Sequence, residues 1–218
     1  MVKQRVTETE EGIQGEFNVQ AYDQMMRRMR DKGWLETKLI FKAGITNGSA
    51  LEVGPGPGYL GLEWLGQTEG TDLKGMEISP DMIRIAERNA RDYGLEGRVE
   101  YIKGDAQKMP FDDCMFDAVF TNGSLHEWSQ PAAVFNEICR VLKPGGRYCI
   151  SDLRRDMNPL VRWFMKLVAK PKEIKPRLIT SMNAAYTLEE IRSILNRSQL
   201  RLPQTRREIM GLVITGEK

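Results

Sequence analysis

From residue 50 to residue 152, short apolar runs alternate with amphipathic stretches, and no other feature of the sequence limits the fold as strongly. The runs have the length of buried strands, while the stretches carry apolar residues at helical spacing. We expect strands over residues 50–54, 73–78, 98–103, 116–121 and 147–152. We expect helices over residues 58–66, 79–94 and 131–142. Because strands and helices that alternate with short connections build a parallel, doubly wound sheet, the sequence predicts an α/β fold.

Residues that commonly begin and end helices support these boundaries. Ser79 is placed to cap the second of these helices, and Pro80 follows at its first position. Gly94 is expected to end the same helix. Further along, Thr187 is followed three residues later by Glu190, which predicts a capping box at the start of another helix.

Outside this stretch the chain follows other patterns. Apolar residues at helical spacing predict helical structure over residues 18–43, with a break at Gly33. After residue 152 the alternation stops until the helix at Thr187, and two β-like runs, near 200–202 and 208–215, then predict an antiparallel hairpin at the sheet edge. We therefore expect one domain in four parts: a helical cap (1–45), a core (48–152), a basic lid-like insertion (153–186), and a C-terminal helix with hairpin (187–218).

A glycine-rich turn follows the first predicted strand, in the sequence Leu-Glu-Val-Gly-Pro-Gly-Pro-Gly-Tyr-Leu-Gly over residues 51–61. Glycines at such a turn let a ligand approach the backbone closely, and the next helix directs its first N–H groups toward that ligand. Gly56, Gly58 and Gly61 have the spacing of dinucleotide-binding turns. Glu77 ends the next strand about 20 residues later, where a ribose diol would bind. The turn therefore indicates a cofactor that contains adenosine.

Neighbouring residues narrow the choice of cofactor. Glu52 lies in the first strand, and its carboxylate suits a cationic ammonium group better than a pyrophosphate, which it would repel. Asp105 follows the third strand and is placed to accept a hydrogen bond from an adenine amino group. The fourth strand leads into Asn122, and the helix after it runs into Lys-Pro-Gly-Gly over residues 143–146. With these motifs, residues 48–152 resemble the class I S-adenosylmethionine-dependent methyltransferases.

The resemblance is closest to the small-molecule branch of this family, which includes quinone-methylating enzymes. It implies a Rossmann-like sheet of seven strands with the last strand antiparallel, and S-adenosyl-L-methionine bound over the carboxyl ends of the first four strands. It also implies the cofactor-binding residues: Glu52, Gly54, Gly56 and Gly58 at the methionine part, Glu77 at the ribose, Ile78, Met82, Asp105 and Ala106 at the adenine, and Asn122 and Gly123 beside the sulfonium.

Methyl transfer from a sulfonium is an in-line displacement, so the protein mainly aligns the reactants, and a base is needed only for an acceptor that carries a proton. Two residues are candidates for a catalytic role. His126, the single histidine, lies in the loop after the fourth strand, and its alternative role is to hold that loop. The resemblance places Tyr22 over the cofactor, and its alternative role is packing in a helix. No metal is expected, because two arginines separate the acids Asp152 and Asp156.

A basic segment follows the fifth strand. Residues 154–177 contain eight Lys or Arg and two acids, a net charge of +6 in a chain whose total is +2. A helix expected over residues 159–169 has a broad apolar face, and basic residues recur every four positions on its other face. Three interpretations stay open: a lid over the acceptor site, an interfacial helix at a membrane through residues 158–170, and a solvated charged face.

The leading functional prediction is S-adenosylmethionine-dependent methyl transfer to a small, partly apolar acceptor, with the acceptor atom (O, N, C or S) left open. Three alternatives remain: an RNA or protein methyltransferase that uses the basic segment, a nicotinamide-dependent oxidoreductase that uses the glycine spacing, and a methyltransferase-like binding module. Two observations argue against nucleic acid as a partner. The total charge is nearly neutral, and Asn-Gly-Ser-Leu over residues 122–125 replaces the Asn/Asp-Pro-Pro-aromatic loop of many base-methylating enzymes.

Composition predicts the compartment. The chain has three cysteines without a Cys-x-x-Cys pair, which predicts neither a disulfide framework nor a zinc site. No apolar run approaches the roughly 20 residues of a membrane span, and the first residues lack the apolar segment of a secretory signal. These observations favour the cytoplasm.

Overall fold

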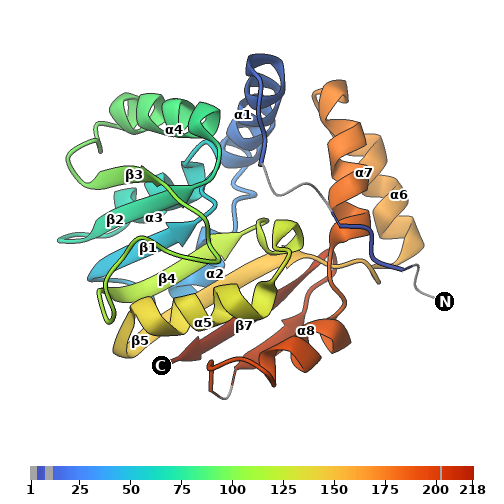
Figure 1. Cartoon of the computed structure of the whole chain (residues 1–218). Coiled ribbons are helices and arrows are strands. Elements are labelled where there is room, and N and C mark those ends of the chain that lie inside the picture. Colours follow the sequence, from blue (N-terminus) through green and yellow to red (C-terminus); the bar gives the residue numbers. More distant parts are fainter. Residues whose placement is uncertain (1–3, 8–11, 202) are drawn as a thin grey trace.

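A seven-stranded sheet forms the centre of the computed structural model, which describes residues 4–7, 12–201 and 203–218. Within these residues the strands are β1 (Ser49–Val53), β2 (Asp72–Glu77), β3 (Val99–Lys103), β4 (Phe116–Asn122), β5 (Leu142–Leu153), β6 (Gln204–Arg207) and β7 (Gly211–Glu217). They lie in the order β3-β2-β1-β4-β5-β7-β6 (Figure 1). Neighbouring strands from β3 to β5 pair in parallel, whereas β7 is antiparallel to both β5 and β6. The predicted α/β fold, with an antiparallel hairpin at the sheet edge, is confirmed.

Helices cover both faces of the sheet. They are α1 (Glu16–Asp31), α2 (Thr37–Lys42), α3 (Tyr59–Gly66), α4 (Pro80–Tyr93), α5 (Pro131–Val141), α6 (Pro159–Val168), α7 (Lys175–Ala184) and α8 (Leu188–Leu195), with the 3-10 turns η1 (Leu125–Glu127) and η2 (Lys172–Ile174). One core cluster contains Val119 of β4 with Phe135 of α5 and Ile191 of α8. A second contains Phe120 of β4 with Trp64 of α3. Successive residues of β4 are thus buried on opposite faces, which is typical of a central parallel strand.

The strand order reverses between β1 and β4. From β1 the chain continues to β2 and β3 on one side, and from β4 it continues to β5 on the other. Open α/β sheets bind ligands in the crevice beyond the carboxyl ends of the strands at such a switch point. The glycine turn after β1 and the loop after β4 both lie at this place, so the topology brings the two predicted site segments together.

The predicted helix boundaries hold where capping residues carried the prediction. The hydroxyl of Ser79 accepts a hydrogen bond from the N–H of Met82 (3.3 Å) at the start of α4, and Gly94 ends that helix with φ of 66°. At α8, the Thr187 hydroxyl accepts from the N–H of Glu190 (3.2 Å), and the Glu190 carboxylate accepts from the N–H of Thr187 (2.8 Å). Both the helix caps and the capping box are therefore confirmed.

Three strands have boundaries that differ clearly from the expected ones, and one of them, β7, begins at Gly211 rather than near residue 208. β5 begins at Leu142 rather than near residue 147, because the main chain of Gly145 and Gly146 exchanges hydrogen bonds of 2.8 and 2.9 Å with that of Lys218. β6 occupies Gln204–Arg207 rather than residues 200–202. Leu200 packs into the core as part of the preceding loop, and Leu202 lies outside the described residues. β6 itself is a polar edge strand, so it carries no apolar alternation to reveal it.

The insertion after β5 contains two helices. α6 matches the helix expected over residues 159–169, whereas α7 was not anticipated. The buried residues of α7 are Ser181, Met182 and Ala184, so this helix buries a single large apolar side chain and leaves no apolar stripe in the sequence. Among the described residues, no helix is both long enough and apolar enough to cross a membrane.

The capping box of α8 allows a test of the fold. We expect Thr187→Ala to lower the free energy of unfolding by about 1 kcal/mol, because it removes the acceptor for the N–H of Glu190. Thr187→Ser is the matched control and should keep most of the wild-type value. Urea denaturation measures both, and an unchanged free energy for Thr187→Ala would contradict the assignment of this cap.

Candidate active site

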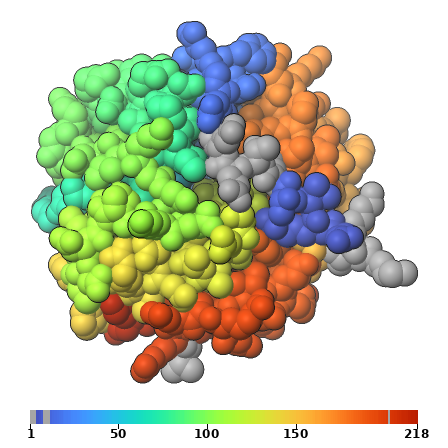
Figure 2. All heavy atoms as spheres, viewed as in Figure 1, coloured from blue at the N-terminus to red at the C-terminus, as the bar shows by residue number. Residues whose placement is uncertain are grey.

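A cavity opens beyond the carboxyl ends of the strands, at the switch point between β1 and β4. Segments far apart in the sequence form its wall, and Figure 2 shows blue α1 between the green segment that contains α4 and the orange segments of α6 and α7. The lining residues are Gly12, Ile13, Tyr22, Val53, Gly54, Gly56, Met76, Glu77, Ile78, Met82, Gly104, Asp105, Ala106, Gln107, Gly123, Ser124, Glu127, Trp128, Ser129 and Val134.

The glycine turn bends from β1 toward the end of β2. Gly54, Gly56 and Gly58 have φ values of 66°, 54° and 83°, in the left-handed region that side chains disfavour. At Gly54, a Cβ atom would also lie only 2.8 Å from the Cβ of Ser124 in the loop after β4. Glycine is therefore required at Gly54 both for the backbone conformation and for the close approach of the two loops.

The carboxylate of Glu77 holds this turn in place. One oxygen accepts a hydrogen bond from the N–H of Gly56 (3.0 Å), and the other accepts from the N–H groups of Ile78 (2.9 Å) and Ser79 (3.0 Å). Burial raises the pKa of Glu77, although the N–H groups of Ser79 and Gly56 act in the opposite direction. A carboxylate can accept about four hydrogen bonds, so the main chain leaves one position for a ligand hydroxyl.

Glu52 of β1 is buried and is not among the residues that line the cavity. Its Oε2 is buried and has no hydrogen-bond partner among the described residues. A Cβ at Gly61 of α3 would collide with this oxygen, so the glycine there makes room for the carboxyl group. Burial and the neighbouring Glu77 raise the pKa of Glu52 to about 8, while a backbone hydrogen bond from Gly61 lowers it. The carboxyl group is therefore mainly protonated at neutral pH.

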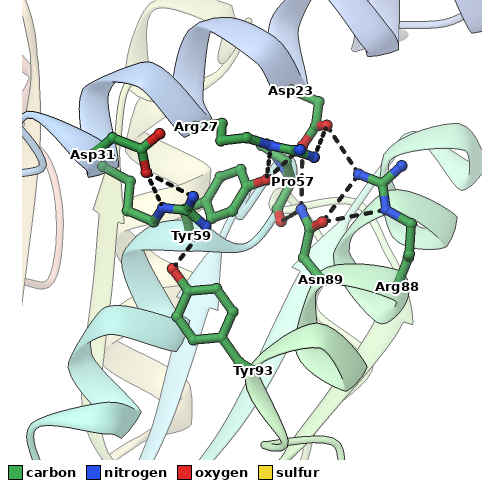
Figure 3. Close-up of polar contacts among 9 residues, drawn as sticks. Asp23, Arg27, Asp31, Pro57, Tyr59, Arg88, Asn89 and Tyr93 are labelled. Atoms are coloured by element: carbon green, nitrogen blue, oxygen red, sulfur yellow. Dashed lines mark hydrogen bonds and ion pairs between the residues drawn. The ribbon is translucent and has the colours of Figure 1, made fainter.

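Helix α1 is held beside the cavity by the buried carboxylate of Asp23 (Figure 3). Its Oδ1 accepts from the hydroxyl of Tyr59 (2.9 Å) and from the amide of Asn89 (3.2 Å), and its Oδ2 accepts from Arg88 (2.9 Å). The amide of Asn89 also donates to the carbonyl of Pro57 in the glycine turn (2.9 Å). Burial opposes ionisation, yet hydrogen bonds from Asn89, Tyr59 and Arg88 lower the pKa of Asp23. This carboxylate thus connects α1, α3, α4 and the turn.

Tyr22 adjoins Asp23 and lines the cavity. Its ring lies 3.4 Å from the position that a Cβ of Gly56 would occupy. Burial, with the nearby Glu127 carboxylate, raises the pKa of the Tyr22 phenol. The phenol therefore keeps its proton at neutral pH and is suited to donate a hydrogen bond rather than to act as a base. A catalytic role for Tyr22 stays a prediction.

At the end of β4 and in the loop after it, the predicted site residues Asn122, Gly123 and His126 lie in different surroundings. His126 is buried with Nδ1 2.9 Å from both carboxylate oxygens of Asp152, and its main-chain N–H donates to the same carboxylate (2.6 Å). The Asn122 amide donates to the hydroxyl of Ser151 (2.8 Å). Gly123 lines the cavity, but His126 and Asn122 do not. This geometry favours the alternative in which His126 holds the loop, and its catalytic role stays a prediction.

Most of the residues expected at the cofactor meet at the cavity wall: Gly54, Gly56, Glu77, Ile78, Met82, Asp105, Ala106 and Gly123. Glu52, Gly58 and Asn122 are not in the wall. Glu127, also in the wall, was not selected from the sequence; its carboxylate accepts a hydrogen bond from Arg177 of α7 (2.6 Å), a contact that no sequence signal indicates. Among the described residues, no group of three or more His, Cys, Asp or Glu side chains could hold a metal ion.

Comparisons with known proteins agree with this arrangement. Residues 51–150 match the family model of a methyltransferase domain. The chain is 36% identical over 121 residues to a demethylmenaquinone methyltransferase from Clavibacter sepedonicus, which corresponds to 54% of this chain and 47% of that protein. It is 33% identical over 120 residues to YdaC, an uncharacterized methyltransferase from Bacillus subtilis, which corresponds to 55% of this chain and 64% of that protein. The chain spans about half the length of the curated relatives it matches.

A solved structure supports the fold. The structure of an S-adenosylmethionine-dependent methyltransferase from Aquifex aeolicus superposes with a TM-score of 0.64 at 20% identity, over 83% of this chain and 87% of that one. The sheet order and the glycine turn at its switch point define an α/β protein with a nucleoside-type cofactor site. Residues 51–150 thus form a methyltransferase domain, and the solved structure with the same fold is described as S-adenosylmethionine-dependent.

The residues in the cavity fit this cofactor. Gly56 leaves a cradle between the turn and the ring of Tyr22 that a side chain would fill. Glu77 offers an acceptor to ribose hydroxyls, and Asp105, whose Oδ1 accepts from the N–H of Gln107 (2.9 Å), offers one to an adenine amino group. These acceptors match the ribose hydroxyls and the adenine amino group of S-adenosylmethionine.

The buried Glu52 predicts a pH-dependent stability. Its folded pKa of about 8 lies above the ordinary value of 4.5, so between these values the unfolded chain releases a proton that the folded chain retains. Each pH unit in this interval then lowers the free energy of unfolding by at most about 1.4 kcal/mol. The free energy of unfolding of Glu52→Gln, relative to that of wild type, should therefore rise as the pH is raised from about 5 to about 8, as measured by urea denaturation. A difference that does not vary with pH would refute the raised pKa.

The hydrogen bonds of Asp23 predict the effect of a second substitution. Asp23→Asn should lower the free energy of unfolding by about 2 kcal/mol, because a buried charged acceptor of four side chains, those of Arg27, Tyr59, Arg88 and Asn89, is lost. It should also weaken binding of S-adenosylhomocysteine, since α1 then packs less firmly beside the cavity. Asp31→Asn on the exposed end of the same helix is the control and should change stability by less than about 0.5 kcal/mol. Equal effects of the two substitutions would contradict the role of Asp23.

Proposed function

We propose that this protein transfers the methyl group of S-adenosylmethionine to a small, partly apolar acceptor by in-line displacement. The observation that carries the proposal is the cavity at the switch point, where Glu77 keeps an acceptor position beside the glycine turn. The matched methyltransferase domain over residues 51–150 supports it. We further propose that the cap (1–45), core (48–152), insertion (153–186) and C-terminal part (187–218) act as one unit.

The roles of the residues follow from the site. When bound, S-adenosylmethionine supplies a methyl group that is already activated on a sulfonium, so alignment and desolvation are the main tasks of the protein. Glu77 and Asp105 would hold the nucleoside part, and the glycine turn would hold the methionine part. Tyr22 closes the cavity from α1 and excludes water while its raised pKa keeps the phenol neutral.

The acceptor side of the cavity supports a partly apolar substrate. Trp128 and Val134 lie in its wall, and Ile13 approaches from the segment before α1. The Trp128 ring is fixed by an edge-to-face contact with Phe135, with ring centres 5.7 Å apart. The demethylmenaquinone methyltransferases among the relatives are named for a quinone-type acceptor, so we propose a compound of this size and polarity as the first to test.

Glu77 provides the test of the cofactor site. Titration calorimetry should show binding of S-adenosylhomocysteine to the wild-type protein, and Glu77→Ala should weaken it at least about tenfold, because both the ribose acceptor and the anchor of Gly56 are lost. Glu100→Ala on the exposed face of β3 is the matched control and should bind normally. Unchanged affinity in Glu77→Ala would refute the assignment, and binding of NADH instead would refute the proposed class of cofactor.

The acceptor requires its own experiment. Release of S-adenosylhomocysteine should rise when demethylated quinols are offered, and stay at background with RNA or with peptides. Turnover with RNA, lost steeply as salt rises, would overturn the small-molecule acceptor.

A further inference from the structure

Helix α6 exposes its apolar side to solvent. In an α-helix with about 3.6 residues per turn, five of its residues share one broad face. The exposed fractions on this face are 75% for Leu160, 62% for Trp163, 56% for Phe164, 58% for Leu167 and 45% for Val168. None of the residues of α6 is buried. An apolar surface of this kind on one element is uncommon in a soluble domain and marks a contact site.

The opposite side of α6 attaches the helix to the protein. The Arg162 guanidinium donates to the carbonyl of Met182 (3.3 Å) and to the side chain of Asn183, both on α7. Val161 and Met165 on the same side are partly buried. A surface helix normally turns its apolar stripe inward and its charges outward, so the orientation of α6 is reversed. Its apolar face therefore does not serve the core of this chain.

α6 is also separate from the cavity. None of its residues lines the cavity, and Figure 1 shows it beside α7 at the edge of the molecule. The link between this region and the site passes through α7, where Arg177 contacts Glu127. Covering the bound cofactor is thus not the role of this apolar face in the structure.

The charges around the face identify the class of partner. Lys166, Lys170, Lys172 and Lys175 form no ion pair with any residue in the described part of the chain, and Glu173 is the one acid between residues 158 and 177. Two copies of this chain joined through α6 would bring these lysines together and repel each other. Exposed Trp, Phe and Leu flanked by unpaired lysines fit an anionic lipid surface instead.

We propose that α6 docks this protein on the surface of an anionic lipid bilayer, with Leu160, Trp163, Phe164, Leu167 and Val168 inserted at the boundary of headgroups and acyl chains. Lys170 and Lys172, which follow the end of α6, contact the lipid headgroups, and α7 connects the docked helix to the cavity wall. The proposal that α6 docks on a lipid surface does not depend on the proposed catalytic function. Its consequence, that an apolar acceptor is reached from the bilayer, rests on the proposed function.

Co-sedimentation of the full chain with vesicles tests the docking. We expect binding to vesicles of equal parts phosphatidylglycerol and phosphatidylcholine at low salt, and about tenfold weaker binding to phosphatidylcholine alone. Trp163→Ser with Phe164→Ser should reduce binding to the anionic vesicles about tenfold, because it removes the insertion, and Lys170→Glu with Lys172→Glu should reduce it through charge. Ile209→Ser, at an exposed apolar residue of the β6–β7 turn, is the matched control and should bind as wild type does.

The outcomes separate the two proposals. Absence of binding to anionic vesicles, or equal binding of wild type and the Trp163/Phe164 variant, overturns the docking. Sedimentation velocity without lipid that shows a dimer lost in the same variant would assign the face to a second copy and overturn it as well. All variants should bind S-adenosylhomocysteine normally, since the substituted residues lie outside the cavity. If the wild-type protein does not bind S-adenosylhomocysteine, this result would instead refute the proposed function.

Discussion

The Glu77 carboxylate is the interaction on which the cofactor site depends. Three backbone N–H groups converge on it, one from the glycine turn after β1 and two from Ile78 and Ser79 between β2 and α4. It therefore fixes two neighbouring strand ends relative to each other while one acceptor position is left for a ligand. The turn that it anchors has positive φ values at Gly54 and Gly56, and Gly54 closely approaches Ser124.

A second buried carboxylate, Asp23, fixes the helical cap in the same way, by accepting several hydrogen bonds. It joins α1 to Tyr59, Arg88 and Asn89, and Asn89 in turn holds the carbonyl of Pro57 in the glycine turn. Tyr22, its neighbour in sequence, is thereby placed against Gly56. Because a buried carboxylate needs several donors to stay ionised, this network couples the position of α1 to the geometry of the cofactor site.

Periodicity and capping residues were sufficient to predict most of the fold. Strands β1 to β4 are short and bounded by turn residues, and Ser79, Gly94, Thr187 and Glu190 carry local hydrogen bonds that any context would favour. α7 was missed because Met182 is the one large apolar residue that it buries, and β6 was displaced because an edge strand carries no apolar alternation. The amphipathic pattern of α6 was visible, but a pattern does not state which face packs inward.

For the candidate site, too, the sequence determined one part and the tertiary structure decided the other. The sequence by itself determined the glycine turn, Glu77 and Asp105, because their spacing along successive strands requires them to meet at the carboxyl edge of a parallel sheet. Only the tertiary structure decided that Glu52 is buried outside the cavity wall, that His126 is bound to Asp152, and that α6 turns its apolar face outward. The physical reason is that side-chain direction and long-range contacts depend on packing between distant segments, which local spacing does not encode.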